Sequence, residues 1–295
     1  MSKEPYLIKK ITPANFPSLL HEIPGPPASL YLRGTLPDPS QFYYLAVVGS
    51  RKYTSYGREA VELLIRGLSG YPICIVSGLA MGIDGIAHRT ALDAGLPTVA
   101  IPGSGLSDHV LYPRTHVSLA HEILESGGAL LSEYEPELAA APWTFPQRNR
   151  IMAGLSSGTL VVEAEELSGT LITARLALDY NRNVFAVPGP IFSATSKGTN
   201  RLIRQGATPI TSARELLDEL GFAPPEQSDS GALPLDLTLF TPDEQAVLLL
   251  LDEPRAREEI LASLNTPPAQ ILSILTILEI KGVVQEQMGK IRRTK

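Results

Sequence analysis

The chain changes character at Tyr44-Leu45-Ala46-Val47-Val48-Gly49-Ser50-Arg51, where an unbroken apolar run ends in a glycine, a serine and an arginine. A run that is apolar at every position is typical of a strand buried on both faces of a parallel sheet. Five more such runs follow, and stretches of helical length separate them. This alternation predicts an α/β fold with a doubly wound, mainly parallel sheet. The six runs are 44–48, 73–76, 98–101, 129–131, 159–162 and 184–187.

Small and polar residues follow nearly every predicted strand. In a doubly wound sheet the ligand binds at the carboxyl ends of the strands, near the point where the strand order reverses. Glycines there let a ligand approach the backbone, and the helices that follow offer free N–H groups. The first group alone fits a phosphate site and a tight turn with a surface arginine about equally. Three of these groups are candidates for binding a ligand: Gly49, Ser50 and Arg51; Ser77, Gly78 and Gly82; and Ser168, Gly169 and Thr170.

The segment Phe145-Pro146-Gln147-Arg148-Asn149-Arg150 places two arginines beside an aromatic residue, ahead of a helix predicted from about Ile151. Cations beside aromatic rings suit single-stranded nucleic acid, because phosphates need positive charge and bases need a stacking face. The alternative is an arginine-rich helix start that pairs with acidic neighbours such as Glu133 or Glu135. Residues 145–210 carry seven cations and four carboxylates in a chain of net charge −6, which favours an anionic ligand on this half of the sheet.

Composition and motifs exclude several classes of protein. The 295 residues are 44% apolar and 19% charged, as in a globular chain of roughly two domains. Neither the dinucleotide fingerprint nor the P-loop motif is present, which argues against cofactor-driven redox chemistry and ATP hydrolysis. The single cysteine, Cys74, excludes an internal disulfide and does not support a cysteine-based zinc site. Because no signal peptide or membrane-spanning run is found, we expect a cytoplasmic protein.

Few residues of the sequence are candidates for catalysis. His88 follows Asp84 by four residues on one predicted helix face, a spacing that fits helix packing better than acid–base chemistry. We therefore expect no catalytic residue, no metal ion and no cofactor. The alternative to a non-catalytic nucleic-acid-binding protein is a nucleotide or phosphoribosyl hydrolase with Asp84 or Glu163 as the acid–base group. Loops that bind phosphate fit both nucleic-acid binding and hydrolysis.

The chain divides into four parts by composition. A Pro-rich N-terminal lead-in is expected over 1–42, the α/β core over 43–220, a linker over 221–238 and a second domain over 239–295. Three short predicted helices followed by a hairpin indicate that the last part is a winged helix-turn-helix.

Taken together, these motifs resemble the DNA-processing protein A (DprA/Smf) family. The matches run in order over about 43–210, which makes the resemblance far more specific than any single motif. They are Gly49-Ser50-Arg51, Ser77-Gly78-Leu79-Ala80 with Gly82-Ile83-Asp84, Tyr112-Pro113, Ser132-Glu133-Tyr134, Phe145-Pro146 with Arg148-Asn149-Arg150, Ser168-Gly169-Thr170, Pro188-Gly189 and Gly198-Thr199-Asn200.

The resemblance implies an extended Rossmann-like core that binds single-stranded DNA without catalysis. Such a protein protects incoming DNA and loads the RecA recombinase onto it during natural transformation or recombination, and it is expected to be a homodimer. Arg51 would hold a phosphate, and the Ser77–Gly82 and Ser168–Thr170 loops would supply donors. Phe145 would lie against a base. The remaining candidates along the DNA backbone are Arg148, Asn149, Arg150 and Lys197.

The sequence departs from the family pattern in two respects. Many relatives carry a helical domain ahead of the core, where this chain has its Pro-rich lead-in. Many also have a basic residue beside the Phe-Pro motif, whereas this chain has Pro142, Trp143, Thr144 and Gln147. The C-terminal part resembles the family's winged-helix tail, whose partner is expected to be duplex DNA or a protein. A regulator that acts through this tail is a third interpretation, and its basic residues are Lys290, Arg292, Arg293 and Lys295.

Overall fold

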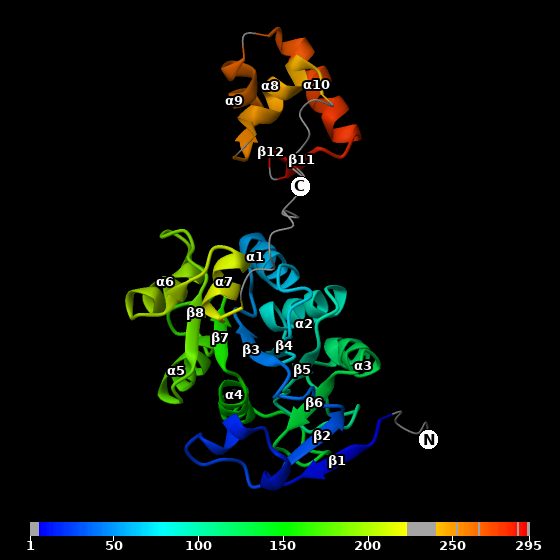
Figure 1. Cartoon of the computed structure of the whole chain (residues 1–295), viewed down its shortest axis with the longest axis vertical. Coiled ribbons are helices and arrows are strands. Elements are labelled where there is room, and N and C mark those ends of the chain that lie inside the picture. Colours follow the sequence, from blue (N-terminus) through cyan, green and yellow to red (C-terminus); the bar gives the residue numbers. More distant parts are fainter. Residues whose placement is uncertain (1–5, 223–239, 252, 265, 288, 294–295) are drawn as a thin grey trace. The chain divides into compact units, whose positions relative to one another are not determined.

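The computed structural model describes residues 6–222, 240–251, 253–264, 266–287 and 289–293. They form two compact units that divide near residue 224. In Figure 1 the first unit runs from blue to yellow and the second from orange to red. From residue 223 onward, the linker predicted over 221–238 lies outside the described residues.

Within the described part of the chain, nine strands form one sheet in the order β1-β2-β6-β5-β4-β3-β7-β8-β9. The seven strands β3 to β9 are parallel to one another, which confirms the predicted doubly wound, mainly parallel sheet. The bounds are β1 Ile8–Ile11, β2 Leu30–Gly34, β3 Tyr43–Val48, β4 Ile73–Ser77, β5 Thr98–Ala100, β6 Ala129–Ser132, β7 Gly158–Val161, β8 Asn183–Ala186 and β9 Thr208–Pro209.

The strand order reverses between β3 and β7. From β3 the chain builds outward through β4, β5 and β6, and it then returns to the other side of β3 with β7, β8 and β9. The parallel pairing of β3 with β7 sets Val48 beside Val161. The carboxyl ends of these two strands therefore mark the switch point at which ligands bind in such sheets.

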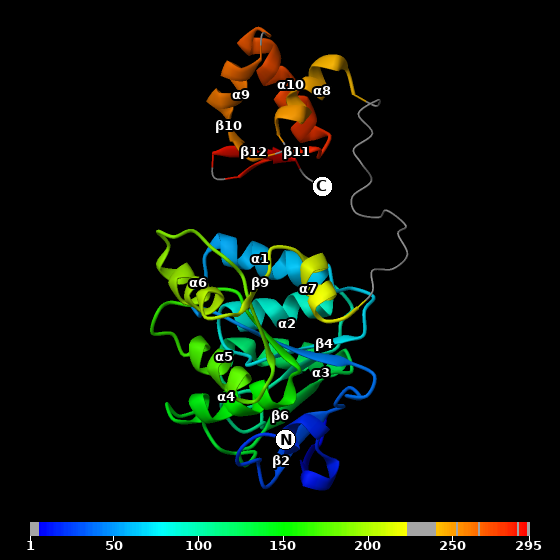
Figure 2. The same cartoon turned by 60° about the vertical axis from the view of Figure 1, so that its left-hand side comes forward.

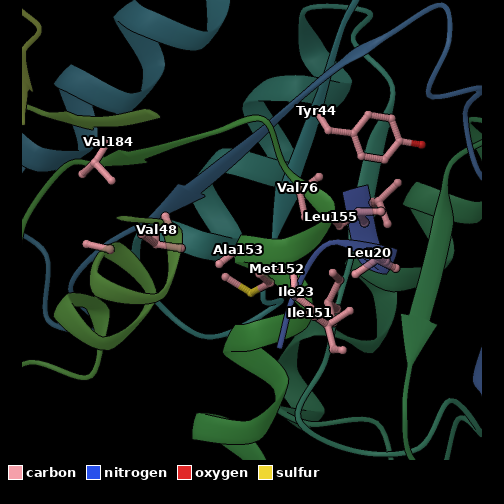
Figure 3. Close-up of a cluster of buried hydrophobic side chains, with 14 of the residues drawn as sticks. Leu20, Ile23, Tyr44, Val48, Val76, Ile151, Met152, Ala153, Leu155 and Val184 are labelled. Atoms are coloured by element: carbon pink, nitrogen blue, oxygen red, sulfur yellow. The ribbon is translucent and has the colours of Figure 1, made fainter. Parts of the chain in front are cut away.

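Helices cover both faces of the sheet. On one face α1, α2 and α7 pack through Leu64, Ile83 and Leu216, and α3 continues this layer toward β6. On the other face α4, α5 and α6 lie over a second cluster, part of which is drawn in Figure 3. Figure 2 shows the two layers from a second direction. The bounds are α1 Ser55–Arg66, α2 Ile83–Asp93, α3 Val117–Glu125, α4 Thr144–Leu155, α5 Thr170–Asp179, α6 Lys197–Arg204 and α7 Ala213–Glu219.

The Pro-rich N-terminal segment adds two antiparallel strands to the sheet. β2 pairs with β6 and β1 pairs with β2. The guanidinium of Arg33, fully buried on β2, forms an ion pair with Asp108 at 2.5 Å. The described prolines of this segment all lie outside β1 and β2, so neither strand loses a backbone N–H donor to proline. In its described part, the segment expected to be an extended lead-in thus belongs to the same compact unit.

Helix α4 begins at Thr144, seven residues earlier than predicted. Pro146 falls in its first turn, where a backbone N–H has no partner within the helix and proline is tolerated. The preceding residue, Trp143, forms no side-chain cap, so the usual polar start signal is absent. Phe145, Arg148 and Asn149 therefore lie on a helix and not in the loop before one.

The second unit has the predicted winged-helix architecture. Three helices pack around a core that includes Leu248, Ile260, Leu275 and Leu278. A strand that the sequence did not predict, β10, joins the hairpin to give the order β10-β12-β11. The bounds are α8 Pro242–Leu250, β10 Arg255–Ala256, α9 Arg257–Ser263, α10 Pro268–Ile280, β11 Val284–Gln287 and β12 Lys290–Arg293.

Candidate nucleic-acid interface

A pocket of about 470 Å³ opens at the carboxyl ends of β3 and β7, between the N-terminal turns of α4 and α5. It lies at the switch point of the sheet, and we call it the strand-end pocket. Nine of the fourteen residues predicted from the sequence line it: Gly49, Ser50, Arg51, Phe145, Arg148, Asn149, Ser168, Gly169 and Thr170. Segments far apart in the sequence thus converge where the strand pattern predicts a ligand.

Arg51 and Phe145 form a cation–aromatic pair in the pocket. The guanidinium carbon of Arg51 lies 5.0 Å from the centre of the Phe145 ring, and Tyr112 contacts that ring edge-on at 5.8 Å. Phe145 also lies against Gly103, where an added Cβ would come within 2.6 Å of the ring. Within the described residues Arg51 forms no ion pair. Its side chain is exposed, so its charge is available to an anion.

Two loops are joined across the mouth of the pocket. The Thr170 hydroxyl donates to the carbonyl oxygen of Gly49 at 3.0 Å, and the backbone N–H of Thr170 donates to Ser168 Oγ at 3.2 Å. On the other loop the N–H of Lys52 donates to Ser50 Oγ at 3.0 Å. These contacts hold the turn after β3 against the start of α5, so the hydroxyl groups are fixed before a ligand arrives.

Arg148 lies beneath the pocket and is only 5% exposed. Its guanidinium donates to the carbonyl oxygen of Gly78 at 2.6 Å and to that of Ile101, joining α4 to the ends of β4 and β5. Burial lowers the pKa of Arg148 to about 10, so the group stays charged at neutral pH. Asp84 lies nearby and accepts from the N–H of Gly78 at 3.1 Å. Burial raises the pKa of this carboxyl, and the charge of Arg148 opposes the rise.

The structure leaves five predicted residues outside the pocket lining. Ser77 is fully buried and donates to the carbonyl oxygen of Val47 at 2.6 Å. Gly82 has a φ of +85° and lies against the backbone of Arg51, where a side chain would collide. Arg150 pairs with Glu133, as the alternative interpretation expects. The remaining two are Gly78, whose carbonyl holds Arg148, and Lys197, which is exposed at the start of α6.

Several lining residues were not singled out by the sequence. Lys52 directly follows Arg51 and adds a second exposed cation, a signal that was available in the sequence. Met152 is the ninth residue of α4 and Thr173 the fourth of α5, and only the packing of these helices brings them to the pocket. Glu165 contributes a carboxylate, so the pocket is not uniformly basic.

The residues considered for acid–base chemistry are held by internal contacts. Glu163 accepts from the N–H of Thr54 at 2.9 Å, from its hydroxyl at 2.7 Å and from the hydroxyl of Thr195 at 2.9 Å. His88 is buried beside Thr98, 2.7 Å from the hydroxyl, and burial lowers its pKa to about 3. His88 is therefore neutral at physiological pH. The contacts of both residues indicate structural roles.

Replacing Glu163 by glutamine is expected to lower the free energy of unfolding by about 1–3 kcal/mol, because an amide can accept fewer of these three hydrogen bonds. Urea unfolding measures the change. The exposed Glu166, replaced in the same way, serves as the matched control and is expected to shift the value by less than about 0.5 kcal/mol. Equal stability of the two variants would contradict the structural role of Glu163.

Among the described residues, no cluster of three or more histidine, cysteine or acidic side chains is arranged to hold a metal ion. In the same part of the chain, no helix has both the length and the apolar character needed to cross a bilayer.

Comparison with known proteins shows the family of this chain. The sequence profile of DNA recombination-mediator protein A matches residues 8–221, and that of the DprA winged helix domain matches residues 222–290. The protein Smf of Escherichia coli is 39% identical over 271 residues, which cover 89% of this chain and 71% of that protein. The DNA processing protein DprA of Bacillus subtilis is 40% identical over 210 residues, which cover 71% of this chain and 70% of that protein.

Two solved structures are similar to this one. The DNA processing protein A of Streptococcus pneumoniae superimposes with a TM-score of 0.67 and 39% sequence identity, over 72% of this chain and 74% of that one. That of Helicobacter pylori, whose structure concerns its single-stranded DNA binding mode, gives a TM-score of 0.65 and 30% identity over 72% of this chain and 95% of that one. The chain therefore belongs to the DNA recombination-mediator protein A (DprA/Smf) family and carries the winged-helix domain of that family.

Proposed function

We propose that this protein binds single-stranded DNA in the strand-end pocket and passes it to the RecA recombinase. The observation that carries the proposal is the Arg51 guanidinium, which lies over the Phe145 ring at the switch point of the sheet. One group offers charge for a phosphate and the other an aromatic face for a base. Lys52 adds a second exposed cation next to Arg51.

This chemistry does not depend on base sequence. Phosphate contacts and base stacking are available to every nucleotide, and the binding constant falls as salt rises because counterions are released from the strand. A duplex hides its base faces, so it competes poorly for a pocket that uses stacking. The DNA processing protein A of Helicobacter pylori is described as binding single-stranded DNA, which supports the same ligand class here.

No catalytic step is part of the proposal. A hydrolase on this fold would need a carboxylate free to exchange a proton with a water molecule or leaving group. Glu163 accepts three internal hydrogen bonds and does not line the strand-end pocket. Asp84 does line it but is committed to the N–H of Gly78 beside the Arg148 charge. These contacts favour binding over turnover.

The recombination role rests on the family. Membership of the recombination-mediator family supports a hand-off of the strand to RecA, protection of incoming DNA and natural transformation as the setting. We propose a homodimer for the same reason, with two pockets acting on one strand. If hand-off occurs, RecA filaments are expected to assemble faster on a long strand that this protein has coated.

In the described part of the winged-helix unit, several cations are held by internal contacts. Helix α10, which takes the place of a recognition helix, contains no lysine or arginine over 268–280. Arg257 pairs with Glu286, and Arg293 donates to the carbonyl oxygen of Leu248. Lys295 lies outside the described residues. We therefore assign the single-stranded DNA site to the first unit. Of the two partners expected for the second unit, duplex DNA and a protein, these contacts favour a protein.

Fluorescence anisotropy with a labelled poly-dT strand of about 30 nucleotides tests the proposal. The full chain is expected to bind tightly at low salt, and the slope of log K against log salt is expected to be about −0.7 for each phosphate contacted. An unlabelled duplex should compete weakly. No binding at low salt, or turnover of a mononucleotide by the wild-type protein, would overturn the proposal.

A further inference from the structure

A groove of about 350 Å³ runs between α1 and α2, on the sheet face opposite α4 and α5. Arg58, Glu62 and Arg66 are spaced four residues apart and share one face of α1. Along α2 the lining runs from the N-cap residue, Gly82, to Asp93, which is eleven residue steps or about 16 Å of helix. The groove, which we call the α1–α2 groove, therefore extends along the full length of α2.

Three arginines line this groove. Arg58 and Arg66 lie on α1 and Arg89 lies on α2. Arg58 pairs with Glu62 at 2.7 Å and Arg89 pairs with Glu122 at 3.7 Å, but both arginine side chains are more than half exposed. Exposed pairs of this kind contribute little free energy, so either arginine can exchange its carboxylate for a phosphate at small cost.

Arg66 has the most available charge. It is exposed and forms no ion pair within the described residues. Two carboxylates, Glu62 and Asp93, line the groove against the three arginines. His116 also lines it; its Nδ1 is hydrogen-bonded to the carbonyl oxygen of Leu79 at 2.8 Å, which leaves Nε2 for another partner. The residues that line the groove carry three positive and two negative charges, and a third carboxylate, Glu122, pairs with Arg89 from outside the lining.

The groove begins where the strand-end pocket ends. Arg51 and Lys52 line the pocket, and the next residue, Tyr53, lines the groove. Gly82, at the head of the groove, lies so close to this turn that an added Cβ would come within 2.7 Å of Arg51 Cα. Two residues of extended chain span at most about 7 Å, so the two hollows lie on the two sides of one turn.

We propose that the α1–α2 groove is a second backbone-binding site for the same DNA strand. The inference rests on the proposed function. A strand held at Arg51 passes over the turn and lies along the groove, where Arg58, Arg66 and Arg89 bind successive phosphates. At the spacing of about 3.4 Å per nucleotide in a duplex strand, or more when a strand is extended, 16 Å accommodates several phosphates. Tyr53, a residue that is 42% exposed, offers an aromatic side chain for a base between the two sites.

The test compares poly-dT strands of about 30 and about five nucleotides, since only the longer one can reach from the pocket into the groove. The variant replaces both Arg66 and Arg89 by alanine in the full chain. The control replaces Lys9 and Arg204, two exposed cations that line neither hollow, and removes the same charge. The variant is expected to bind the long strand roughly tenfold more weakly, with a salt slope smaller by about 1.4. Its affinity for the short strand should match that of the wild type.

Three outcomes separate the possibilities. If the variant binds the long strand like the wild type while Arg51→Ala does not, the groove is off the DNA path and only the proposed function stands. An equal loss in variant and control would show a general charge effect and would also overturn the inference. If the wild type binds neither strand, the proposed function and the inference fail together. Thermal unfolding of each variant confirms that the fold is retained.

Discussion

Replacing Arg51 by alanine is expected to weaken binding of a poly-dT strand of about 30 nucleotides ten- to hundredfold. A hydrogen bond to a charged group contributes about 1.5–3 kcal/mol, and 1.4 kcal/mol corresponds to a factor of ten in affinity. Arg51 is exposed, has no carboxylate partner among the described residues and lies over the Phe145 ring. Its loss removes a phosphate contact and also the cation that covers the stacking residue. Anisotropy over a series of salt concentrations measures both the affinity and the salt slope.

Two further variants make this result specific. Arg51→Lys keeps the charge but loses the planar fork that binds phosphate oxygens in pairs, so its affinity should fall between those of the wild type and Arg51→Ala. Lys9→Ala removes one exposed cation from β1, at the far edge of the sheet, and should bind like the wild type. Wild-type affinity of Arg51→Ala, with unchanged salt slope, would exclude the strand-end pocket as the DNA site.

Replacing Arg148 by methionine is expected to lower the free energy of unfolding by about 3–5 kcal/mol, because two buried carbonyl oxygens lose a charged donor and a buried carboxyl loses a nearby positive charge. For a domain of this size that corresponds to a melting temperature lower by roughly 10 °C. The substitution leaves the carbonyl oxygens of Gly78 and Ile101 without their donor and Asp84 without its neighbouring cation. Differential scanning calorimetry measures the change.

The destabilisation caused by Arg148→Met should depend on pH. Burial raises the pKa of Asp84 above its ordinary 3.8, and removing Arg148 takes away the charge that opposes this rise. A carboxyl with a raised pKa in the folded state disfavours folding when it is ionised. The loss of unfolding free energy in Arg148→Met, relative to the wild type, should therefore be largest at neutral pH and shrink as the pH falls toward 4.

The matched control is Arg175→Met. Arg175 is exposed on α5, so its replacement should change the stability by less than about 0.5 kcal/mol. If Arg148→Met melts at the wild-type temperature but binds DNA weakly, the structural role is contradicted and this guanidinium contacts the DNA directly.

The six central strands were predictable because burial on both faces leaves a signature in the sequence itself. Each is apolar at successive positions, as in Ile73–Ser77, whose five residues are all buried. Strand β2 lacks that signature because it contains Arg33, a charged residue that is nevertheless fully buried through its pairing with Asp108. The start of α4 was missed because its first turn contains Pro146 and no polar cap.

The position of the site was also predictable, since parallel strands bring their carboxyl ends to one edge. Gly49 to Arg51 and Ser168 to Thr170 follow strands β3 and β7, and the structure places both groups in one pocket. The sequence could not separate the arginines by their environment. The candidate cations were Arg51, Arg148 and Arg150. In the structure Arg51 is exposed, Arg148 is buried and donates to two carbonyl oxygens, and Arg150 is paired with Glu133.

Local sequence therefore determined which segments form strands and helices, the edge of the sheet where a ligand binds and the family to which the chain belongs. Hydrophobic periodicity and turn residues act between neighbours in the chain, so these features can be read without the fold. The availability of each charge depends on partners far away in sequence: Arg148 on Gly78 and Ile101, and Glu163 on Thr54. Charge and burial at such positions are set by packing, and only the folded chain brings those partners together.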